Sequence, residues 1–307
     1  MKYFLKEILW FCIPLLLLIL LGEFYVRNRP SVFREKKEQL INNADSVEVL
    51  IVGNSHAMNG INSDLFTMYA HNIAFGSQSI YFDRRITEKY LPILKNLKYV
   101  LISLDYFTLY VDHEENRDFF YKYYYDIDYE DRKFFKEFLL QSFFVYSPQQ
   151  TFSLFLEDLS IKPEAVVKGW SGNYKSDYNA VTSPEECEIR ANTFNKRIDT
   201  YEGGDAILKD LESFIENLKA QNITPILVTC PVYSTLRPYF YKDVLERNEM
   251  ISDYLTQKYG ITHLYYEDDD NYEVSDYYNC DHLNAAGAEK LVPKLDSAII
   301  DIESLTK

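Results

Sequence analysis

Five short apolar runs, each separated from the next by helix-like segments, constrain the fold of this 307-residue chain more than any other feature. Each run has the length of a β-strand and little or no polar face, the pattern of strands that are covered on both sides. Strands that alternate with helices form a parallel sheet between two helical layers. We therefore predict a three-layer α/β/α fold with a mostly parallel five-stranded sheet. The predicted strands are Val47–Val52, Asn72–Phe75, Tyr99–Leu104, Ile223–Thr229 and Ile261–Tyr266.

Segments with helical periodicity fill the intervals between the predicted strands. Apolar side chains recur at helical spacing in Ser79–Leu97, Asp205–Asn222 and Tyr241–Tyr259, which predicts helices that cover the sheet. A last helix is expected to begin just after Asn284, with Pro293 as the site of a kink.

Residues 106–200 interrupt this alternation. The segment is rich in aromatic side chains ("FFYKYYYDIDYEDRKFF"), and Ser183 and Glu186 occupy the two positions of a capping box at the start of a further helix. We predict a mostly helical, aromatic-rich insertion beside the carboxyl edge of the sheet. Its aromatic side chains suit core and interface packing or stacking on sugar rings, and packing is the commoner use.

Residues 8–22 near the N-terminus carry no charge. Fifteen helical residues span about 22 Å, less than the roughly 30 Å of a hydrocarbon layer, but an extension from Tyr3 to Val26 is long enough to cross it. Trp10 and Tyr25 would then serve as aromatic anchors. We predict an uncleaved transmembrane helix. A cleaved signal peptide and a buried core helix are the alternatives, although no A-x-A cleavage pattern follows the apolar run.

The chain is therefore expected to comprise a membrane anchor (1–27), a stalk (28–46) and a main domain (47–307). Lys2 and Lys6 precede the apolar run, while five basic residues follow it between positions 27 and 37. This count alone favours a cytoplasmic main domain, but large domains cross membranes largely regardless of flanking charge.

Charge and cysteine content restrict the classes of ligand. Acidic residues outnumber basic ones by 47 to 32, and a net charge of −15 repels nucleic acid. Cys187, Cys230 and Cys280 are an odd set outside the apolar run, so they cannot all pair. Cys230 and Cys280 both follow strands at one edge, which leaves a disulfide or a metal site between them open. No C-x-x-C or H-E-x-x-H spacing is present, and we expect no metal and no cofactor.

The first predicted strand is followed by Gly53-Asn54-Ser55-His56. Ser55 is therefore expected at the carboxyl ends of the parallel strands, where ligands bind. A serine nucleophile needs a base and an oxyanion site. The best base is His282 in "DYYNCDHLNAAGAEKL", because the loop after the fifth strand opens on the same edge. The alternatives are a plain turn at Ser55 and a packing role for His282. We expect His56 to be a hydrogen-bonding neighbour rather than a second base.

These blocks resemble the SGNH (GDSL-like) hydrolase superfamily, in particular its membrane-anchored bacterial branch that modifies cell-envelope polymers. The nucleophile block corresponds to Gly53–His56, the oxyanion glycine to Gly76 in "NIAFGSQS", and the C-terminal base block to Asn279–Leu283. The resemblance covers residues 47–106 and 205–302. "GNSHA" also resembles the G-x-S-x-G elbow of α/β-hydrolases, but that fold usually places several strands before its elbow.

The resemblance implies a flavodoxin-like SGNH fold in which backbone N–H groups of Ser55 and Gly76 receive the oxyanion. It also implies a triad residue at Asn279, where the family has aspartate; Asp281 and then Asp276 are the alternatives. An aspartate-to-asparagine change costs a serine protease about 10⁴ in rate. The family's G-x-N-D block is absent from "LDYFTL", and one lost oxyanion donor costs about 3–4 kcal/mol.

By the same resemblance we expect a serine esterase or O-acyltransferase, with acetyl as the acyl group and a cell-envelope polysaccharide as substrate. The expected partners are an acylated or acyl-accepting glycan and a membrane-bound acyl exporter. The expected location is the inner or cytoplasmic membrane, with a single span and a periplasmic catalytic domain. The alternative is a catalytically inactive SGNH-fold module that binds glycan or assembles a complex.

Overall fold

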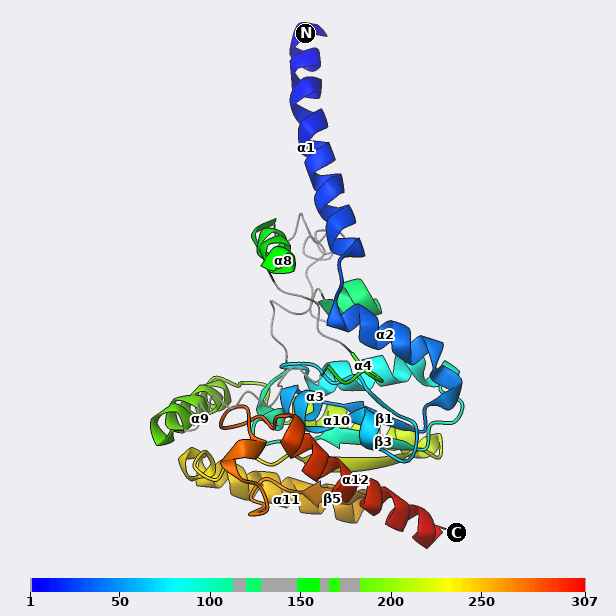
Figure 1. The fold of residues 1–307 in the computed structure, drawn as a ribbon, viewed down its shortest axis with the longest axis vertical. Coiled ribbons are helices and arrows are strands. Elements are labelled where there is room, and N and C mark those ends of the chain that lie inside the picture. The colour runs from blue at the N-terminus through cyan, green and yellow to red at the C-terminus, as the bar shows by residue number, and fades with distance from the viewer. Residues whose placement is uncertain (1, 113–119, 128–147, 161–165, 172–182, 307) are drawn as a thin grey trace. The chain divides into compact units, whose positions relative to one another are not determined.

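The computed structural model describes residues 2–112, 120–127, 148–160, 166–171 and 183–306 (Figure 1). The chain divides into two compact units. The smaller combines residues 1–34 with 115–163, and the larger combines 35–114 with 164–307. The rest of the predicted insertion lies outside the described residues.

The larger unit is built on a five-stranded sheet in which every pairing is parallel and the order is β2-β1-β3-β4-β5. This confirms the predicted α/β/α class, and the order is that of a doubly wound fold. The strands are β1 (Val49–Val52), β2 (Ala70–Asn72), β3 (Tyr99–Ser103), β4 (Thr224–Thr229) and β5 (Thr262–Tyr265).

The predicted second strand was wrong in its limits, because β2 ends where the prediction began. The Ile73 N–H still bonds to Ile51 O (2.9 Å) and the Phe75 N–H to Gly53 O (3.1 Å). Between them the Ala74 N–H, which points away from β1 at the edge of the sheet, bonds to the side chain of Asn72 (2.9 Å). The apolar residues after Asn72 therefore form a loop that stays beside the end of β1.

Two helical layers cover the sheet. Helix α10 packs on α4 and β4 while α11 packs on β5, and α12 packs on α3 (Figure 1). Two of the predicted helices are confirmed with small shifts at their ends, and Pro293 lies inside α12. The predicted helix Ser79–Leu97 is shorter, since its α-helical part ends at Tyr90 and a 3-10 turn (Leu91–Ile93) follows. The helices of this unit are α3 (Ser55–Gly60), α4 (Ile80–Tyr90), α9 (Pro184–Asp199), α10 (Ala206–Ala220), α11 (Lys242–Tyr259) and α12 (Ala285–Thr306).

The predicted N-cap of α9 is confirmed. The Glu186 N–H donates to Ser183 Oγ at 3.3 Å. The return contact differs from a capping box, because the Ser183 hydroxyl donates to the Glu186 carboxylate at 3.0 Å.

The predicted stalk is partly integrated into the larger unit. It contains α2 (Val32–Asn42), where Lys36 is fully buried and donates to Ala74 O at 2.6 Å. Burial lowers the pKa of Lys36 to about 7. Gln39 donates to Val166 O at 2.8 Å. Residues 35–46 of the predicted stalk are thus part of the α/β unit rather than a free linker.

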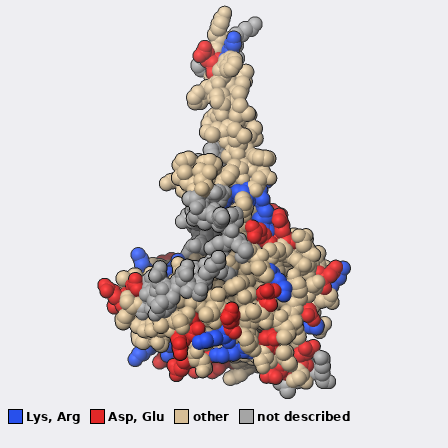
Figure 2. All heavy atoms as spheres, in the orientation of Figure 1, with Lys and Arg blue, Asp and Glu red and all other residues tan. Residues whose placement is uncertain are grey.

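The smaller unit contains α1 (Lys2–Asn28), whose segment Lys6–Asn28 is long and apolar enough to cross a membrane. Figure 2 shows an uncharged surface along this helix, with charged side chains near its ends. Its most apolar stretch is not buried, as a core helix would be. A membrane span and a signal sequence both meet this description.

Four described aromatic residues of the insertion, between positions 120 and 125, pack against Phe33 of α2. Phe33 stacks on Phe120 at 5.1 Å and on Tyr124 at 5.8 Å, and Tyr121 and Tyr125 meet it edge-on. The three tyrosines are buried. These side chains are used for packing. The other described helices of this unit are a short π-helix (Tyr121–Tyr125) and α8 (Pro148–Ser160).

Gly53 connects β1 to the start of α3. Its φ of +137° lies in a region that residues with a Cβ rarely adopt. A Cβ at this position would lie 2.2 Å from Ser103 Cβ on the adjacent strand β3. Only glycine lets the chain leave the sheet here, and this exit places Ser55.

Replacing Gly53 with alanine should lower the free energy of unfolding by about 3 kcal/mol, because backbone strain adds to overpacking. Gly260→Ala is the matched control. Gly260 also has a positive φ (+60°), but nothing lies within 4 Å of a Cβ there, so we expect a loss of about 1 kcal/mol. Urea unfolding of both variants tests this, and equal losses would contradict the steric argument.

Candidate active site

Ser55 is the first residue of α3, directly beyond the carboxyl end of β1. The Asn54 side chain caps the helix by accepting the His56 N–H at 2.8 Å. Asn59 donates to the Ser55 carbonyl at 2.7 Å, so the backbone is held on both sides of the hydroxyl. The gap between β1 and β3 is the switch point of this strand order, where ligands bind in doubly wound folds.

His282 lies in hydrogen-bond contact with Ser55, with 2.8 Å between His282 Nε2 and Ser55 Oγ. The two residues are 227 positions apart in the chain. The loop that carries His282 is fixed by the Tyr278 N–H, which donates to the His282 carbonyl at 2.8 Å. The ring is buried, since His282 is only 5 % exposed. The predicted nucleophile and the predicted base are therefore brought together.

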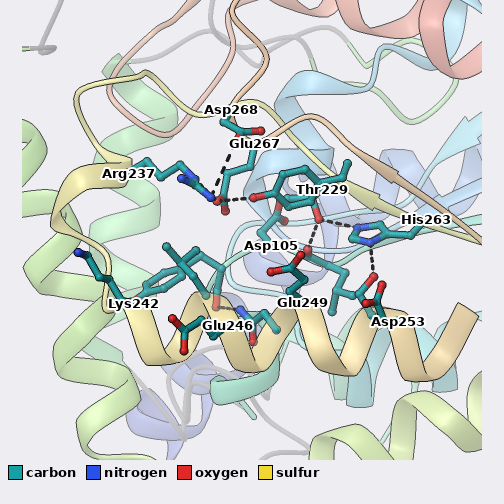
Figure 3. Close-up of a pocket in the computed structure, with 16 residues that line it drawn as sticks. Asp105, Thr229, Arg237, Lys242, Glu246, Glu249, Asp253, His263, Glu267 and Asp268 are labelled. Atoms are coloured by element: carbon teal, nitrogen blue, oxygen red, sulfur yellow. Dashed lines mark hydrogen bonds and ion pairs between the residues drawn. The ribbon is translucent and has the colours of Figure 1, made fainter.

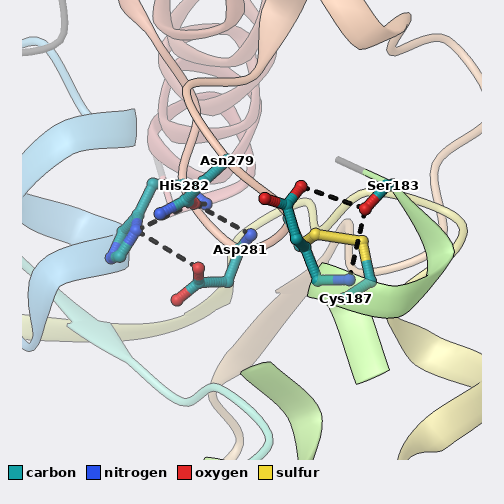
Figure 4. The surroundings of a disulfide bond; sticks show 7 residues. Ser183, Cys187, Asn279, Asp281 and His282 are labelled. Carbon is teal, nitrogen blue, oxygen red and sulfur yellow. Dashed lines mark hydrogen bonds and ion pairs between the residues drawn. A yellow bond between two sulfur atoms is a disulfide. The ribbon is translucent and has the colours of Figure 1, made fainter. Parts of the chain in front are cut away.

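Two side chains face the other ring nitrogen of His282 (Figure 4). Asn279 Oδ1 is a hydrogen-bond partner of Nδ1 at 3.1 Å and also accepts the backbone N–H groups of Asp281 and His282. Asp281 Oδ1 lies 3.3 Å from Nδ1, an ion-pair distance. Asn279 can thus orient the ring, and Asp281 places a negative charge beside it.

The third candidate, Asp276, has a different role. Its carboxylate accepts the Lys290 ammonium at 2.6 Å and the Glu273 N–H at 2.7 Å. Asp276 therefore caps a short helical turn of the loop. Its carboxylate bonds to Lys290 and to the Glu273 backbone rather than to His282.

A second histidine extends the buried network. His56 Nδ1 lies 3.3 Å from Asp105 Oδ1, and His56 Nε2 lies 3.4 Å from Asp281 Oδ2. The rings of His56 and His282 meet edge-on at 5.3 Å. His56 was expected to be a neighbour of the site, and it bridges two carboxylates.

Asp105 was not identified from the sequence, although it follows β3 in the stretch "LDYFTL". Both carboxylate oxygens are bonded. Asp105 Oδ2 accepts from Asn54 (2.8 Å) and from the Ser103 hydroxyl, and Oδ1 accepts the Cys230 N–H (3.0 Å). The position after β3 therefore holds a buried acceptor rather than an oxyanion donor.

The pKa values of His56 and His282 are shifted in opposite directions. Burial alone would lower the pKa of His56, but the carboxylates of Asp105 and Asp281 outweigh it and raise this pKa to about 9. Burial lowers the pKa of His282 to about 4, although Asp281 acts in the opposite direction. Burial works against the ionisation of Asp281, yet its cationic neighbours hold its pKa well below the usual range. At neutral pH, His282 is a neutral base and His56 is an imidazolium.

Arg190 on α9 supplies the other cation for Asp281. Its Nη2 donates to Asp281 Oδ2 at 2.6 Å, and its guanidinium lies over the Phe194 ring at 4.8 Å. Nothing in the sequence pattern pointed to this residue, which lies in the insertion 91 positions before its partner.

A disulfide joins Cys187 of α9 to Cys280, the residue before Asp281 (Figure 4). This corrects the pairing of Cys230 with Cys280 that the sequence left open; Cys230 is buried with a free thiol. The disulfide ties the helix that carries Arg190 to the loop that carries His282.

Gly76 lies in a tight turn, closed by the Gln78 N–H bonding to Phe75 O at 3.0 Å. The turn is held next to the end of β1 by the bond between the Phe75 N–H and Gly53 O. Gly76 therefore lies in the loop that runs beside the chain leading to Ser55. Its oxyanion role stays a prediction.

Within the described ranges, one cluster brings three metal-ligand side chains together: His56, Asp281 and His282, with ligand atoms within 4.8 Å of one another. The Arg190 guanidinium already occupies Asp281 Oδ2. A divalent cation at the same oxygen would be repelled by this charge. The donor set suits proton transfer and charge balance better than it suits a metal.

No protein-family model matches the chain, and no curated protein matches it.

Removing the Cys187–Cys280 disulfide should lower the free energy of unfolding by about 2–5 kcal/mol, because the bond closes a long loop. The test is urea unfolding of Cys187→Ala, with Cys12→Ser, an exposed cysteine outside the bond, as the control. Unchanged stability, or alkylation of all four thiols in the unreduced and unfolded chain, would contradict the assigned pairing.

The charged state of His56 should make stability depend on pH. Its folded pKa of about 9 lies above the unfolded value of about 6.5, so the stabilisation is complete below pH 6.5 and is lost as the pH rises through 9. The titratable groups that face it are Asp105, Asp281 and His282, and Arg190 acts on it through Asp281. The shift corresponds to about 3 kcal/mol.

The measurement is the difference in unfolding free energy between wild type and His56→Gln across pH 6–10. This difference should shrink toward pH 10. A constant difference would contradict a buried imidazolium.

Proposed function

We propose that the protein is a membrane-anchored serine esterase or O-acyltransferase of the SGNH-like type, acting on a cell-envelope polysaccharide. The observation that carries the proposal is the 2.8 Å contact between Ser55 Oγ and the neutral, buried imidazole of His282. A hydroxyl paired with an oriented base is the arrangement that activates a serine nucleophile.

In the proposed first step, His282 Nε2 takes the Ser55 proton as Oγ attacks the ester carbonyl. The oxyanion is received by the backbone N–H groups of Ser55 and Gly76. His282 then returns the proton to the leaving alcohol, which leaves an acyl group on Ser55. Attack by water gives hydrolysis, and attack by a glycan hydroxyl gives acyl transfer.

The buried charges suit this cycle. Before the reaction, Asp105 and Asp281 are balanced by the His56 imidazolium and Arg190. When His282 accepts the proton, the Asp281 charge 3.3 Å away stabilises the new imidazolium. By accepting from Nδ1, Asn279 holds the proton of the neutral His282 ring on that nitrogen. The negative charge that a triad aspartate would supply comes from the neighbouring Asp281.

The disulfide and the N-terminal helix support an extracytoplasmic location. Stable disulfides are rare in reducing cytosol and common in the periplasm. We therefore infer a single-pass protein in the inner or cytoplasmic membrane with a periplasmic catalytic unit. A tethered enzyme there has envelope glycans as neighbouring substrates, and a membrane-bound exporter would supply the acyl group, with acetyl as the inferred one.

The second candidate is an inactive SGNH-fold accessory module. Two observations favour it: Asn279 at the triad position, and Asp105 where the family's block has an oxyanion-donating asparagine. Both functions predict the same fold, and only turnover separates them.

The full chain in detergent should hydrolyse p-nitrophenyl acetate, or transfer its acetyl group to cello- or chito-oligosaccharides. Ser55→Ala should abolish both reactions. Ser46→Ala, at an exposed serine, is the control and should retain full activity. Turnover that survives in Ser55→Ala would overturn the proposed nucleophile, and no turnover with any acceptor would favour the accessory module.

Asp281→Asn should lower kcat/KM by about 10²–10⁴, because the variant loses the charge beside His282 and keeps the ring orientation by Asn279. Asn279→Asp, which still accepts the three hydrogen bonds, should stay within about tenfold of wild type. Asp276→Asn should lower stability while leaving kcat/KM nearly unchanged. A large kinetic loss for Asp276→Asn alone would identify that residue as the orienting acid instead.

A further inference from the structure

A cavity of about 510 Å³ opens beyond the carboxyl ends of β3, β4 and β5, beside one face of α11 (Figure 3). Its volume falls in the range of small-molecule sites, about 300–1,000 Å³. Neither Ser55 nor His282 lines it, but Asp105 does. Asp105 also contacts His56, which is linked to His282 through Asp281, so the cavity borders the same buried charge network.

The floor of the cavity has polar groups in fixed orientations. His263 bonds through Nε2 to the Thr229 hydroxyl at 2.8 Å and through Nδ1 to the Ser252 hydroxyl at 2.5 Å. Burial lowers the pKa of His263 to about 4, so the ring is neutral at physiological pH. The side of α11 that faces the cavity is polar, where a helix covering a sheet is usually apolar.

Glu267 is the second polar group of the floor, and it is buried, with 3 % exposed. The Arg237 guanidinium (3.1 Å) and the Tyr265 hydroxyl (2.8 Å) both donate to Glu267 Oε2. Among the described residues, Oε1 receives no hydrogen bond. A donor on a ligand in the cavity can bond to this oxygen.

The charged side chains at the rim of the cavity disfavour anionic ligands. Glu246, Glu249, Asp253 and Asp268 are acidic side chains at the cavity. The rim also carries Lys242, while Arg237 is paired with Glu267. Acceptors therefore outnumber donors, which favours a ligand rich in hydroxyl or amine donors and disfavours carboxylates and phosphates.

We propose that this cavity binds a neutral or amine-bearing sugar unit of the glycan, as a subsite at the same edge of the sheet as the reacting serine. A sugar offers several hydroxyl donors to the acidic rim and to Glu267 Oε1, and an apolar ring face to the half-exposed Tyr265 ring. The choice of a sugar rests on the proposed function. The presence of the cavity and of the Glu267 Oε1 acceptor does not depend on the proposed function.

The test is calorimetric titration of the full chain carrying Ser55→Ala, in a detergent without a sugar headgroup. The probes are chitosan tetraose, cellotetraose and tetragalacturonate. Chitosan tetraose or cellotetraose should bind, and tetragalacturonate should bind at least tenfold more weakly. Adding Glu249→Gln and Asp253→Asn, two rim positions that should not affect folding, should raise the dissociation constant at least tenfold.

Asp243→Asn is the matched control, since this exposed acid lies on α11 but not in the cavity, and it should leave binding unchanged. Tyr265→Phe removes one hydrogen-bond donor to Glu267 and leaves the charge of the rim unchanged. It should change the dissociation constant through its effect on Glu267 at the floor of the cavity. The subsite is overturned if neither neutral nor amine-bearing oligomer binds, if the rim variants bind as tightly as their parent, or if ethylammonium binds as well as the sugars. The titrated protein carries Ser55→Ala and cannot react, so binding is measured independently of catalysis. A failure to bind would count against the subsite and not against the proposed reaction.

Discussion

The hydrogen bond between Ser55 and His282 is the contact on which the rest of the site depends, because it joins the end of the first strand to the loop before the last helix. Parallel strands make this contact feasible, since both loops open on the same edge of the sheet. Gly53 sets the exit from β1 on one side. Asn279 and the Cys187–Cys280 bond set the loop on the other.

Charge balance explains why this small region contains so many buried ionisable groups. A carboxylate beside the base would be costly to bury alone, so Asp281 is accompanied by Arg190 and by the imidazolium of His56. Asp105 in turn stabilises His56 and is held by the ends of β3 and β4. The same sheet edge therefore fixes the nucleophile, the base and the charges around them.

Periodicity and strand topology made most of the fold predictable from the sequence. Apolar runs located four strands within two residues, and the expected parallel order predicted that Ser55 and His282 would meet. The strand β2 was misplaced because His71 and Asn72 are polar yet fully buried. The positions of Arg190 and of Cys187, the partner of Cys280, depend on how the insertion packs against the sheet edge, and no local pattern encodes that. Asp105 follows β3 directly, but its role depends on contacts with Asn54, His56 and Cys230 that are distant in the sequence.

The most direct test of a reactive serine is covalent labelling of the full chain with a fluorophosphonate, followed by peptide mass spectrometry. A single adduct is expected on the peptide that contains Ser55, formed far more slowly when His282 is replaced by glutamine. An adduct on another serine, or labelling at Ser55 that is indifferent to His282, would contradict it.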